Sequence, residues 1–234
     1  MSPIERNTLL KKWKKWLKVI EFDLGDLLIS HEIFTEIQKM HRDNPDIRKP
    51  TRFYRWLKQN YSTRLAIDIR RLTDQDRRCK RAVSLYRLID DIEGNIGAIT
   101  RKWFSSQYDR RGHDIGLADY DFNEFSRNSH SDIDLDKLER DKKCIEKISD
   151  RVKRFADKFL AHHDYKKRIR KIPTFKDADG ILQQLDKLVC KYELLLNQGA
   201  LVSCKPVSHN WKQPLKKAWI IPQNQIKNRN YISK

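Results

Sequence analysis

The chain is organised around the stretch Arg151-Val-Lys-Arg-Phe-Ala-Asp-Lys-Phe-Leu-Ala-His-His-Asp164, which has the pattern of the end of a long amphipathic helix. Apolar residues recur here at alternating steps of three and four, a spacing that places them on one helix face: Ile145, Ile148, Val152, Phe155 and Phe159. One more step of three reaches His162, so the apolar stripe ends in an imidazole. Arg154 and Lys158 precede His162 at steps of four, which predicts an imidazole beside positive charge.

Outside this stretch the whole chain is strongly basic. Its 234 residues include 50 Lys and Arg against 32 Asp and Glu, a formal net charge of +18. Such an excess favours polyanionic partners, with nucleic acid ahead of an anionic membrane surface. No apolar run approaches the roughly 18–20 residues that a membrane-spanning helix needs, and the start of the chain lacks the apolar region of a signal peptide. We therefore expect a cytoplasmic protein with RNA, not a membrane, as its partner.

The sequence contains no recognisable metal or cofactor motif. The four cysteines are scattered and form no Cys-x-x-Cys pair, which indicates reduced thiols: Cys79, Cys144, Cys190 and Cys204. There is no His-Glu-x-x-His, and no glycine-rich phosphate-binding loop. We therefore expect neither a metal nor a cofactor.

Helical periodicity predicts an all-α fold, a bundle of about five main helices. Thr51 and Thr174 are expected to cap two of them, the second with Asp177 in a capping box, and Gly199 lies just after the last. The predicted helices span residues 4–43, 51–71, 82–103, 134–163 and 174–197.

The periodicity vanishes over residues 105–132, which are polar with scattered aromatics. A connection of this length is predicted to be a loop insertion between helices. We expect residues 1–204 to form a single helical domain that includes this insertion. Residues 205–234 form a basic, Trp-containing C-terminal tail, and its tryptophans suggest that its first part packs on the bundle.

Two interpretations of the central stretch follow from its residues alone. Arg154, Lys158 and His162 drift around one helix face by about 40° per step. They can bind a phosphate while the imidazole moves a proton. Alternatively, the histidine and lysine complement the dipole at a helix C-terminus, with His162 half-buried and hydrogen-bonded.

Four short motifs, taken in order, resemble the HEPN superfamily of helical-bundle proteins, and within it the AbiU-like branch of abortive-infection proteins. The resemblance covers about residues 30–200. The motifs are Leu65-Ala-Ile-Asp-Ile-Arg-Arg-Leu-Thr-Asp74, Val83-Ser-Leu-Tyr-Arg-Leu-Ile-Asp-Asp91, Ala156-Asp-Lys-Phe-Leu-Ala-His-His-Asp164, and Leu182-Gln-Gln-Leu-Asp-Lys-Leu with Tyr192-Glu-Leu-Leu195.

This resemblance implies a metal-independent endoribonuclease centre in the cleft of a homodimer. The family signature is an arginine and a histidine with four to six residues between them, of which the first is usually polar. His162 matches the histidine and Asp157 the polar residue, but Ala156 stands where the arginine is expected. Arginine should hold the scissile phosphate, which alanine cannot do. Arg154 lies about 160° around the helix from Ala156, so it cannot simply replace the missing arginine. Lys158, one turn from His162, is expected to assist electrostatically.

Two further basic groups are candidate RNA-binding residues. A run that follows the histidine is predicted to clamp the RNA backbone beside the cleft, although it could equally be a solvated linker: Lys166, Lys167, Arg168, Arg170 and Lys171. Arg70 and Arg71 belong to a turn that resembles one in the family. A structural role, in which an arginine pairs with Asp74 or caps a helix end, is favoured for them over RNA binding.

The expected function is that of an HEPN-like protein acting on RNA in a phage-defence or toxin-type system. The enzyme would cleave RNA by attack of the 2′-hydroxyl on its own phosphate. Two alternatives remain open, a non-catalytic RNA-binding module and a helical interaction subunit of a larger defence complex. A homodimer and a partner protein of the defence system are the expected assemblies.

Overall fold

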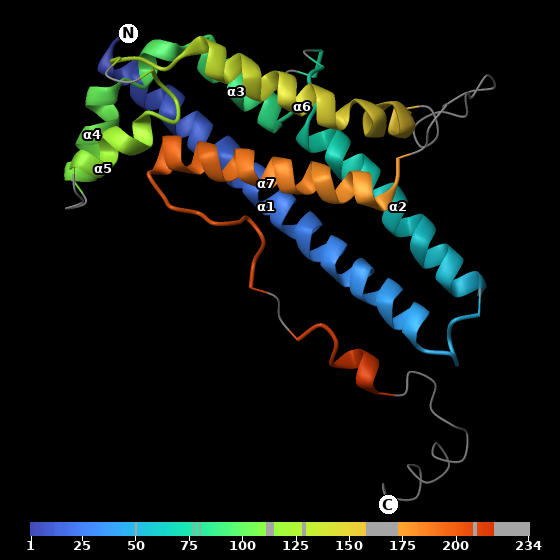
Figure 1. The fold of residues 1–234 in the computed structure, drawn as a ribbon. Coiled ribbons are helices and arrows are strands. Elements are labelled where there is room, and N and C mark those ends of the chain that lie inside the picture. The colour runs from blue at the N-terminus through green and yellow to red at the C-terminus, as the bar shows by residue number, and fades with distance from the viewer. Residues whose placement is uncertain are drawn as a thin grey trace, which may run out of the picture.

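The computed structural model describes residues 1–49, 51–76, 78–79, 81–110, 115–127, 130–157, 173–207 and 210–217. Within these ranges the fold is all-α, as predicted, with no strand and only an isolated backbone bridge between Thr100 and Asp132. The predicted count of about five helices is too low, because the described residues form seven (Figure 1). They are α1 (Pro3–Asp43), α2 (Arg52–Leu72), α3 (Leu85–Glu93), α4 (Arg101–Asp109), α5 (Ile115–Phe122), α6 (Leu135–Phe155) and α7 (Phe175–Asn197).

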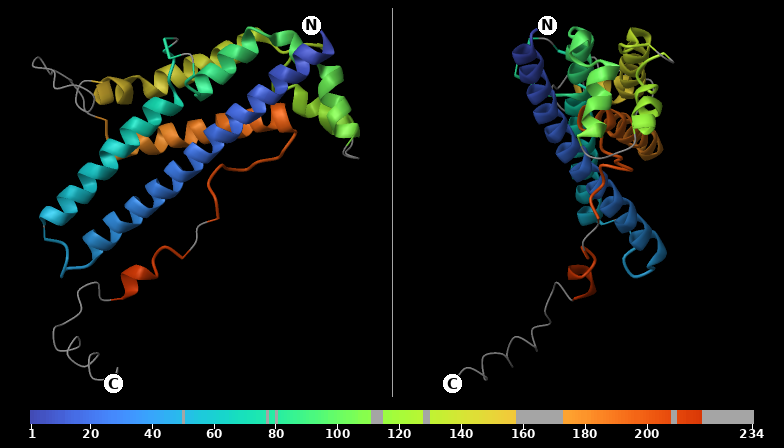
Figure 2. Two further views of the ribbon diagram at one scale, coloured as in Figure 1. Left: turned by 180° about the vertical axis from the view of Figure 1, so that it is seen from behind. Right: turned by 90° about the vertical axis from the view of Figure 1, so that its left-hand side faces the viewer.

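The long helix α1 is the element on which α2, α3 and α7 pack. Ser2 begins it with a capping box, in which the Ser2 hydroxyl accepts from the Glu5 amide and the Glu5 carboxylate accepts from the Ser2 amide. α1 and α2 run antiparallel, and their connecting end projects beyond α6 and α7 (Figure 2). Among the described residues, no helix is long and apolar enough to cross a membrane.

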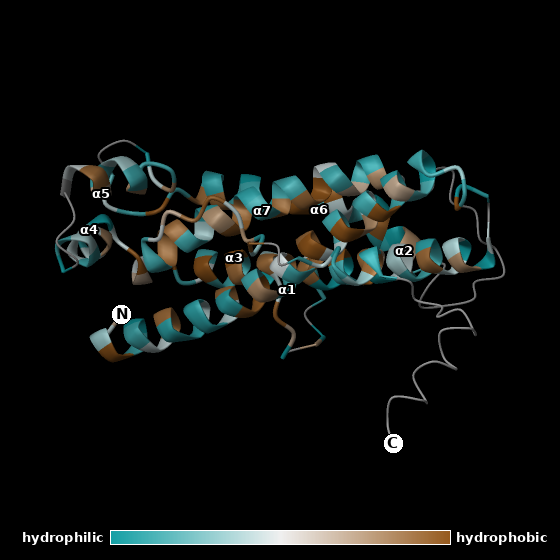
Figure 3. Ribbon diagram, turned by 90° about the horizontal axis from the view of Figure 1, so that it is seen from below, coloured by the Kyte–Doolittle hydropathy of each residue, from teal (hydrophilic) through white to brown (hydrophobic). Residues whose placement is uncertain are grey.

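The apolar faces of the helices meet in one core (Figure 3). Its largest fully buried side chains include five aromatics: Trp13, Phe104, Phe122, Phe125 and Tyr192. The polar atoms of two of them are satisfied, because Trp13 Nε1 donates to Asp91 at 2.5 Å and the Tyr192 hydroxyl donates to Asp141 at 2.9 Å. These bonds attach α1 to α3 and α7 to α6.

Three helices lie where their sequence patterns predict. α1 is unbroken through Gly25, α2 begins after Thr51, whose side chain accepts from the Tyr54 amide at 3.1 Å, and α7 begins at the predicted capping box. Thr174 and Asp177 cap each other's backbone amides there at 3.2 and 2.8 Å. α7 ends at Asn197, followed by Gln198 in the left-handed conformation (φ 51°).

The helix predicted over residues 82–103 is wrong, because two helices occupy this stretch. α3 ends before Gly94, a 3₁₀ turn covers Ile96–Ala98, and α4 starts after Thr100. Two glycines close together weaken helix propagation. The Thr100 side chain also caps the new helix by accepting from the Trp103 amide at 3.2 Å.

The loop insertion predicted over residues 105–132 proves to be partly helical. It contains the end of α4 and all of α5, and it inserts Phe122 and Phe125 into the core with no exposed surface. Arg101 lies 4.8 Å from the Phe122 ring and donates to the Asn123 side chain at 2.8 Å and the His130 carbonyl at 2.8 Å. Tertiary contacts therefore order a segment that has almost no helical periodicity of its own.

The described part of the C-terminal tail packs along α1, as predicted for its first part. Lys205 forms an ion pair with Glu32, and Lys212 pairs with Glu36 at 2.7 Å. At Gly25 the tail approaches so closely that a Cβ atom would lie 2.7 Å from the Cys204 carbonyl oxygen. Glycine is therefore required on α1 for this approach of the tail.

Candidate functional site

The predicted catalytic stretch lies at the end of α6, and the structure describes it only as far as Asp157. The prediction of a helix to residue 163 is confirmed to Phe155, after which Ala156 and Asp157 form a wider, π-helical turn. Several predicted residues lie outside the described ranges: Lys158, His162, Lys166, Lys167, Arg168, Arg170 and Lys171. Their assigned roles therefore stay predictions.

Ala156, at the position of the family arginine, faces the protein interior and is only 2% exposed. Its amide donates to the carbonyls of Val152 and Lys153. A guanidinium buried unpaired in this place would lose its hydration, at a cost of several kcal/mol. Alanine thus suits the packing of α6, and the charge that the signature requires has to come from another position.

An arginine does reach this turn, from the last turn of α2. Arg70 Nε donates to Asp157 Oδ1 at 2.6 Å, across 87 residues of sequence. The two side chains are 48% and 50% exposed. Such an exposed pair adds only about 0–1 kcal/mol to stability, and both groups remain accessible to solvent.

The expectation that Arg70 or Arg71 pairs with Asp74 is wrong. Asp74 lies 3.5 Å from Arg87 instead, and Arg71 reaches Asp23 of α1 at 3.2 Å and Asp68 at 3.5 Å. Arg70 points to α6 and Arg71 points to α1. The two arginines at the end of α2 therefore contact different neighbouring helices.

Lys153 is a residue of this site that the sequence interpretation missed. It lies one turn before Asp157 on α6, on the same side of the helix. Burial lowers the pKa of its amine and neighbouring Arg70 acts in the same direction, whereas Asp74 and Glu146 oppose the shift. The step of four between Lys153 and Asp157 was the available signal, but its importance depends on the approach of α2.

The structure brings the predicted residues together only in part. Arg154 forms an ion pair with Asp150 on its own helix rather than with Asp157. Arg151 instead donates to Asp177 at 2.8 Å and so joins the end of α6 to the start of α7. An apolar groove of about 410 Å³ adjoins the turn and is lined by α2, α6 and α7, with Ile69, Val152 and Phe175 among its residues.

A second polar cluster joins α1, α2 and α7. His31 forms hydrogen bonds with the Tyr61 hydroxyl through Nδ1 and with Asp179 through Nε2, the latter at 2.5 Å. Burial, and then the charge of Asp179, raise the pKa of Tyr61 well above its ordinary value. Tyr61 therefore stays neutral while it shares a hydrogen bond with the imidazole. A buried neutral phenol is a poor nucleophile, so the cluster joins three helices rather than forming a reaction centre.

Replacing Tyr61 with phenylalanine is expected to lower the free energy of unfolding by about 1–3 kcal/mol, because His31 Nδ1 loses its partner in a partly buried place. Urea unfolding measures the change. Tyr120→Phe is the matched control, since Tyr120 is 71% exposed. Equal stability of the two variants would show that the cluster does not hold the helices together.

Comparison with known proteins gives one family. A family model described as HEPN_AbiU2, AbiU2, matches residues 10–218. No curated protein matches the chain, and no solved structure does.

Proposed function

The chain belongs to the AbiU2 family of the HEPN superfamily, a family of abortive-infection proteins of phage defence, and on that premise we propose that it is a metal-independent endoribonuclease. The proposed reaction centre combines His162 with Arg70 and Asp157. RNA is the proposed substrate. Two copies of the chain form the proposed cleft, as the family resemblance implies.

The approach of Arg70 to Asp157 carries this proposal. The family reaction needs a guanidinium at the scissile phosphate, and Ala156 leaves that position without one. Arg70 brings a guanidinium to the adjacent residue from α2. Because the pair is half exposed, an RNA phosphate can replace the carboxylate as its partner, and guanidinium binds phosphate through two parallel hydrogen bonds.

The proposed chemistry is an internal transfer that needs no added nucleophile. His162 removes the proton of a ribose 2′-hydroxyl, and the resulting oxygen attacks the adjacent phosphorus. The bond to the 5′ oxygen breaks, and that oxygen takes a proton, which leaves a 2′,3′-cyclic phosphate and a 5′-hydroxyl. Arg70 stabilises the negative charge that develops on the phosphate oxygens, and in the proposal Lys153 and Lys158 add positive potential.

The net charge of +18 supports RNA as the substrate class. In the proposal the basic run from Lys166 to Lys171 follows the RNA backbone beside His162, and Arg71 extends this surface at the end of α2. Such contacts release counterions, so binding should weaken steeply as salt rises.

A second function, RNA binding without cleavage, is favoured by one observation. Alanine at the position of the signature arginine is built into the core, as its 2% exposure indicates. A family member that has lost catalysis would tolerate this residue. Cleavage and binding therefore have to be measured on the same protein.

Replacing His162 with alanine is expected to abolish RNA cleavage while leaving RNA binding nearly unchanged, because in the proposal the imidazole moves protons and other groups hold the RNA. General acid–base catalysis of this kind is worth about 10²–10⁴-fold in rate. The assay uses labelled RNA in EDTA and identifies the cyclic phosphate product.

His41→Ala is the matched control, since His41 lies at the far end of α1. Cleavage that persists in His162→Ala at the wild-type rate would remove His162 from the site. Salt-dependent binding with no cleavage by the wild-type protein would favour the binding module instead.

A further inference from the structure

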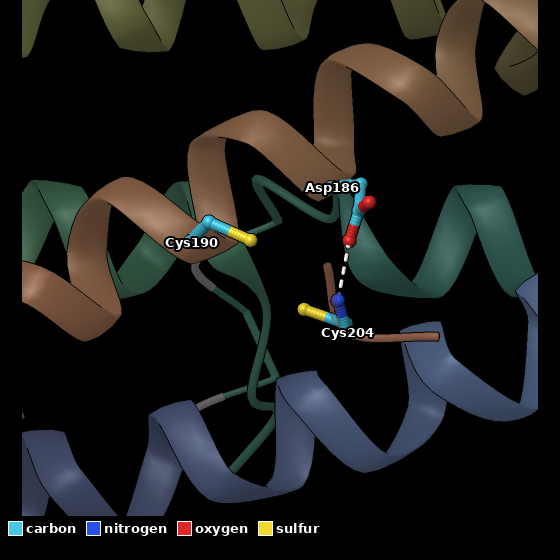
Figure 4. Close-up of side chains that lie close together, drawn as sticks. All are labelled: Asp186, Cys190 and Cys204. Carbon is cyan, nitrogen blue, oxygen red and sulfur yellow. Dashed lines mark hydrogen bonds between the residues drawn. The ribbon is translucent and has the colours of Figure 1, made fainter. Parts of the chain in front are cut away.

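Two thiols and a carboxylate from separate parts of the sequence converge between α7 and α1 (Figure 4). Asp186 and Cys190 lie one turn apart on α7, and Cys204 lies in the segment that leads from α7 into the tail. One carboxylate oxygen and the two sulfur atoms all lie within 4.8 Å of one another. The two sulfurs point toward each other in Figure 4.

The carboxylate is held in place from the tail. Asp186 Oδ1 accepts from the Cys204 amide and Oδ2 accepts from the Ser203 hydroxyl, both at 2.7 Å. Each carboxylate oxygen has a second lone pair, which remains available to a cation. Hydrogen bonds of this kind orient the ligands of a metal.

A second carboxyl group lies near this place on α1. Glu21 lies one turn before Gly25, the residue that contacts Cys204. Its Oε1 atom is buried and finds no hydrogen-bond partner among the described residues.

We propose that Asp186, Cys190 and Cys204 bind a divalent metal ion of the zinc class, with Glu21 as a further carboxylate ligand. Two thiolates select a borderline-soft ion such as Zn²⁺ over Mg²⁺ or Ca²⁺. A cation would neutralise the negative charge of the neighbouring carboxylates and provide a partner for the Glu21 oxygen. The sequence shows no zinc motif because Cys190 and Cys204 come together only after the tail folds back on α7.

The ion would have a structural role. Asp186 lies on α7 about 18 Å beyond the capping residue Thr174, at a rise of about 1.5 Å per residue, whereas the turn with Asp157 joins the start of α7 through Arg151. The ion would instead fasten the tail to α7 just before Lys205, which pairs with Glu32 of α1. It takes no part in the proposed RNA chemistry.

A disulfide between Cys190 and Cys204 is the competing use of the two thiols. A disulfide would use only the two sulfur atoms. A metal ion would use the carboxylate oxygen of Asp186 as well, which lies within 4.8 Å of both sulfurs.

Titrating the reduced full-length chain with Co²⁺, the spectroscopic probe for zinc, tests the proposal. We expect one bound ion per chain with a thiolate-to-cobalt absorption band, displacement by Zn²⁺, and a melting temperature that zinc raises. Cys204→Ser, Cys190→Ser and Asp186→Asn should each weaken binding by more than about tenfold. Cys144→Ser, which changes a half-buried thiol of α6, should bind like wild type.

Several results would overturn the site. They are a missing thiolate band, a band that survives in Cys204→Ser, or an intact mass that shows a disulfide between Cys190 and Cys204 in the purified protein. Circular dichroism without metal checks that each variant folds, and Asp186→Asn tests the site with both thiols present. EDTA would remove this ion, so RNA cleavage is also measured on Cys204→Ser. If this variant binds no metal but still cleaves RNA, loss of the metal is separate from loss of catalysis.

Discussion

Replacing Arg70 with alanine is expected to slow RNA cleavage by about 10²–10³-fold, the usual effect of removing one group that stabilises charge in the transition state. Arg70 reaches the turn where the signature arginine is missing, and its Nε donates to Asp157 Oδ1 at 2.6 Å. Its loss should change the free energy of unfolding by only about 0–1 kcal/mol, because the ion pair is half exposed. Cleavage rates and urea unfolding on the same protein separate a catalytic from a structural effect.

Two further variants sharpen this test. Arg70→Lys keeps the charge but loses the planar fork that binds phosphate, so it should recover only part of the rate. Arg42→Ala is the control, since Arg42 forms a comparable exposed pair with Asp43 at 3.1 Å. If Arg70→Ala cleaves RNA as fast as Arg42→Ala, Arg70 does not replace the missing arginine.

Replacing Phe122 with alanine is expected to destabilise the protein by about 3–5 kcal/mol, the usual cost of removing a buried aromatic ring. Phe122 ends α5, has no exposed surface, and packs against Phe104 with ring centroids 5.3 Å apart. It also lies under the Arg101 guanidinium. Equilibrium unfolding in urea measures the loss.

Tyr120→Ala is the matched control for this prediction, because Tyr120 belongs to the same short helix but is 71% exposed. It should change stability by less than about 0.5 kcal/mol. If both variants unfold at the wild-type urea concentration, residues 115–122 are not part of the cooperative core. Residues 115–122 would then contribute little to the free energy of unfolding, as expected of a loop insertion.

The helices that could be predicted from sequence carry their signals locally. α7 has both residues of its capping box within four positions, and α1 has an apolar stripe that continues past Gly25. α5 could not be predicted in this way. Its eight residues are held by Arg101 and by aromatic packing, which no pattern inside the helix reveals.

In the candidate site, too, some features have a local sequence signal and others depend on tertiary contacts. The sequence marks Asp157 by its place in a family motif, and Arg70 by its place in another. The two residues meet because α2 packs on α6. They are 87 residues apart in the sequence, so no local pattern predicts this contact. Cys190 and Cys204 are likewise unremarkable in sequence, because the reversal of the chain after Gln198 brings them together.

The packing of α1 against α7 also has a consequence for biosynthesis. The apolar face of α1 packs against α7, which the ribosome makes much later, since α7 begins at Phe175. At roughly 5–20 residues per second, the apolar face of α1 waits about ten seconds or more for that partner. A nascent chain that stops before α7 cannot close its core. Only translation through α7 can therefore complete the core, and until then part of the apolar face of α1 has no partner.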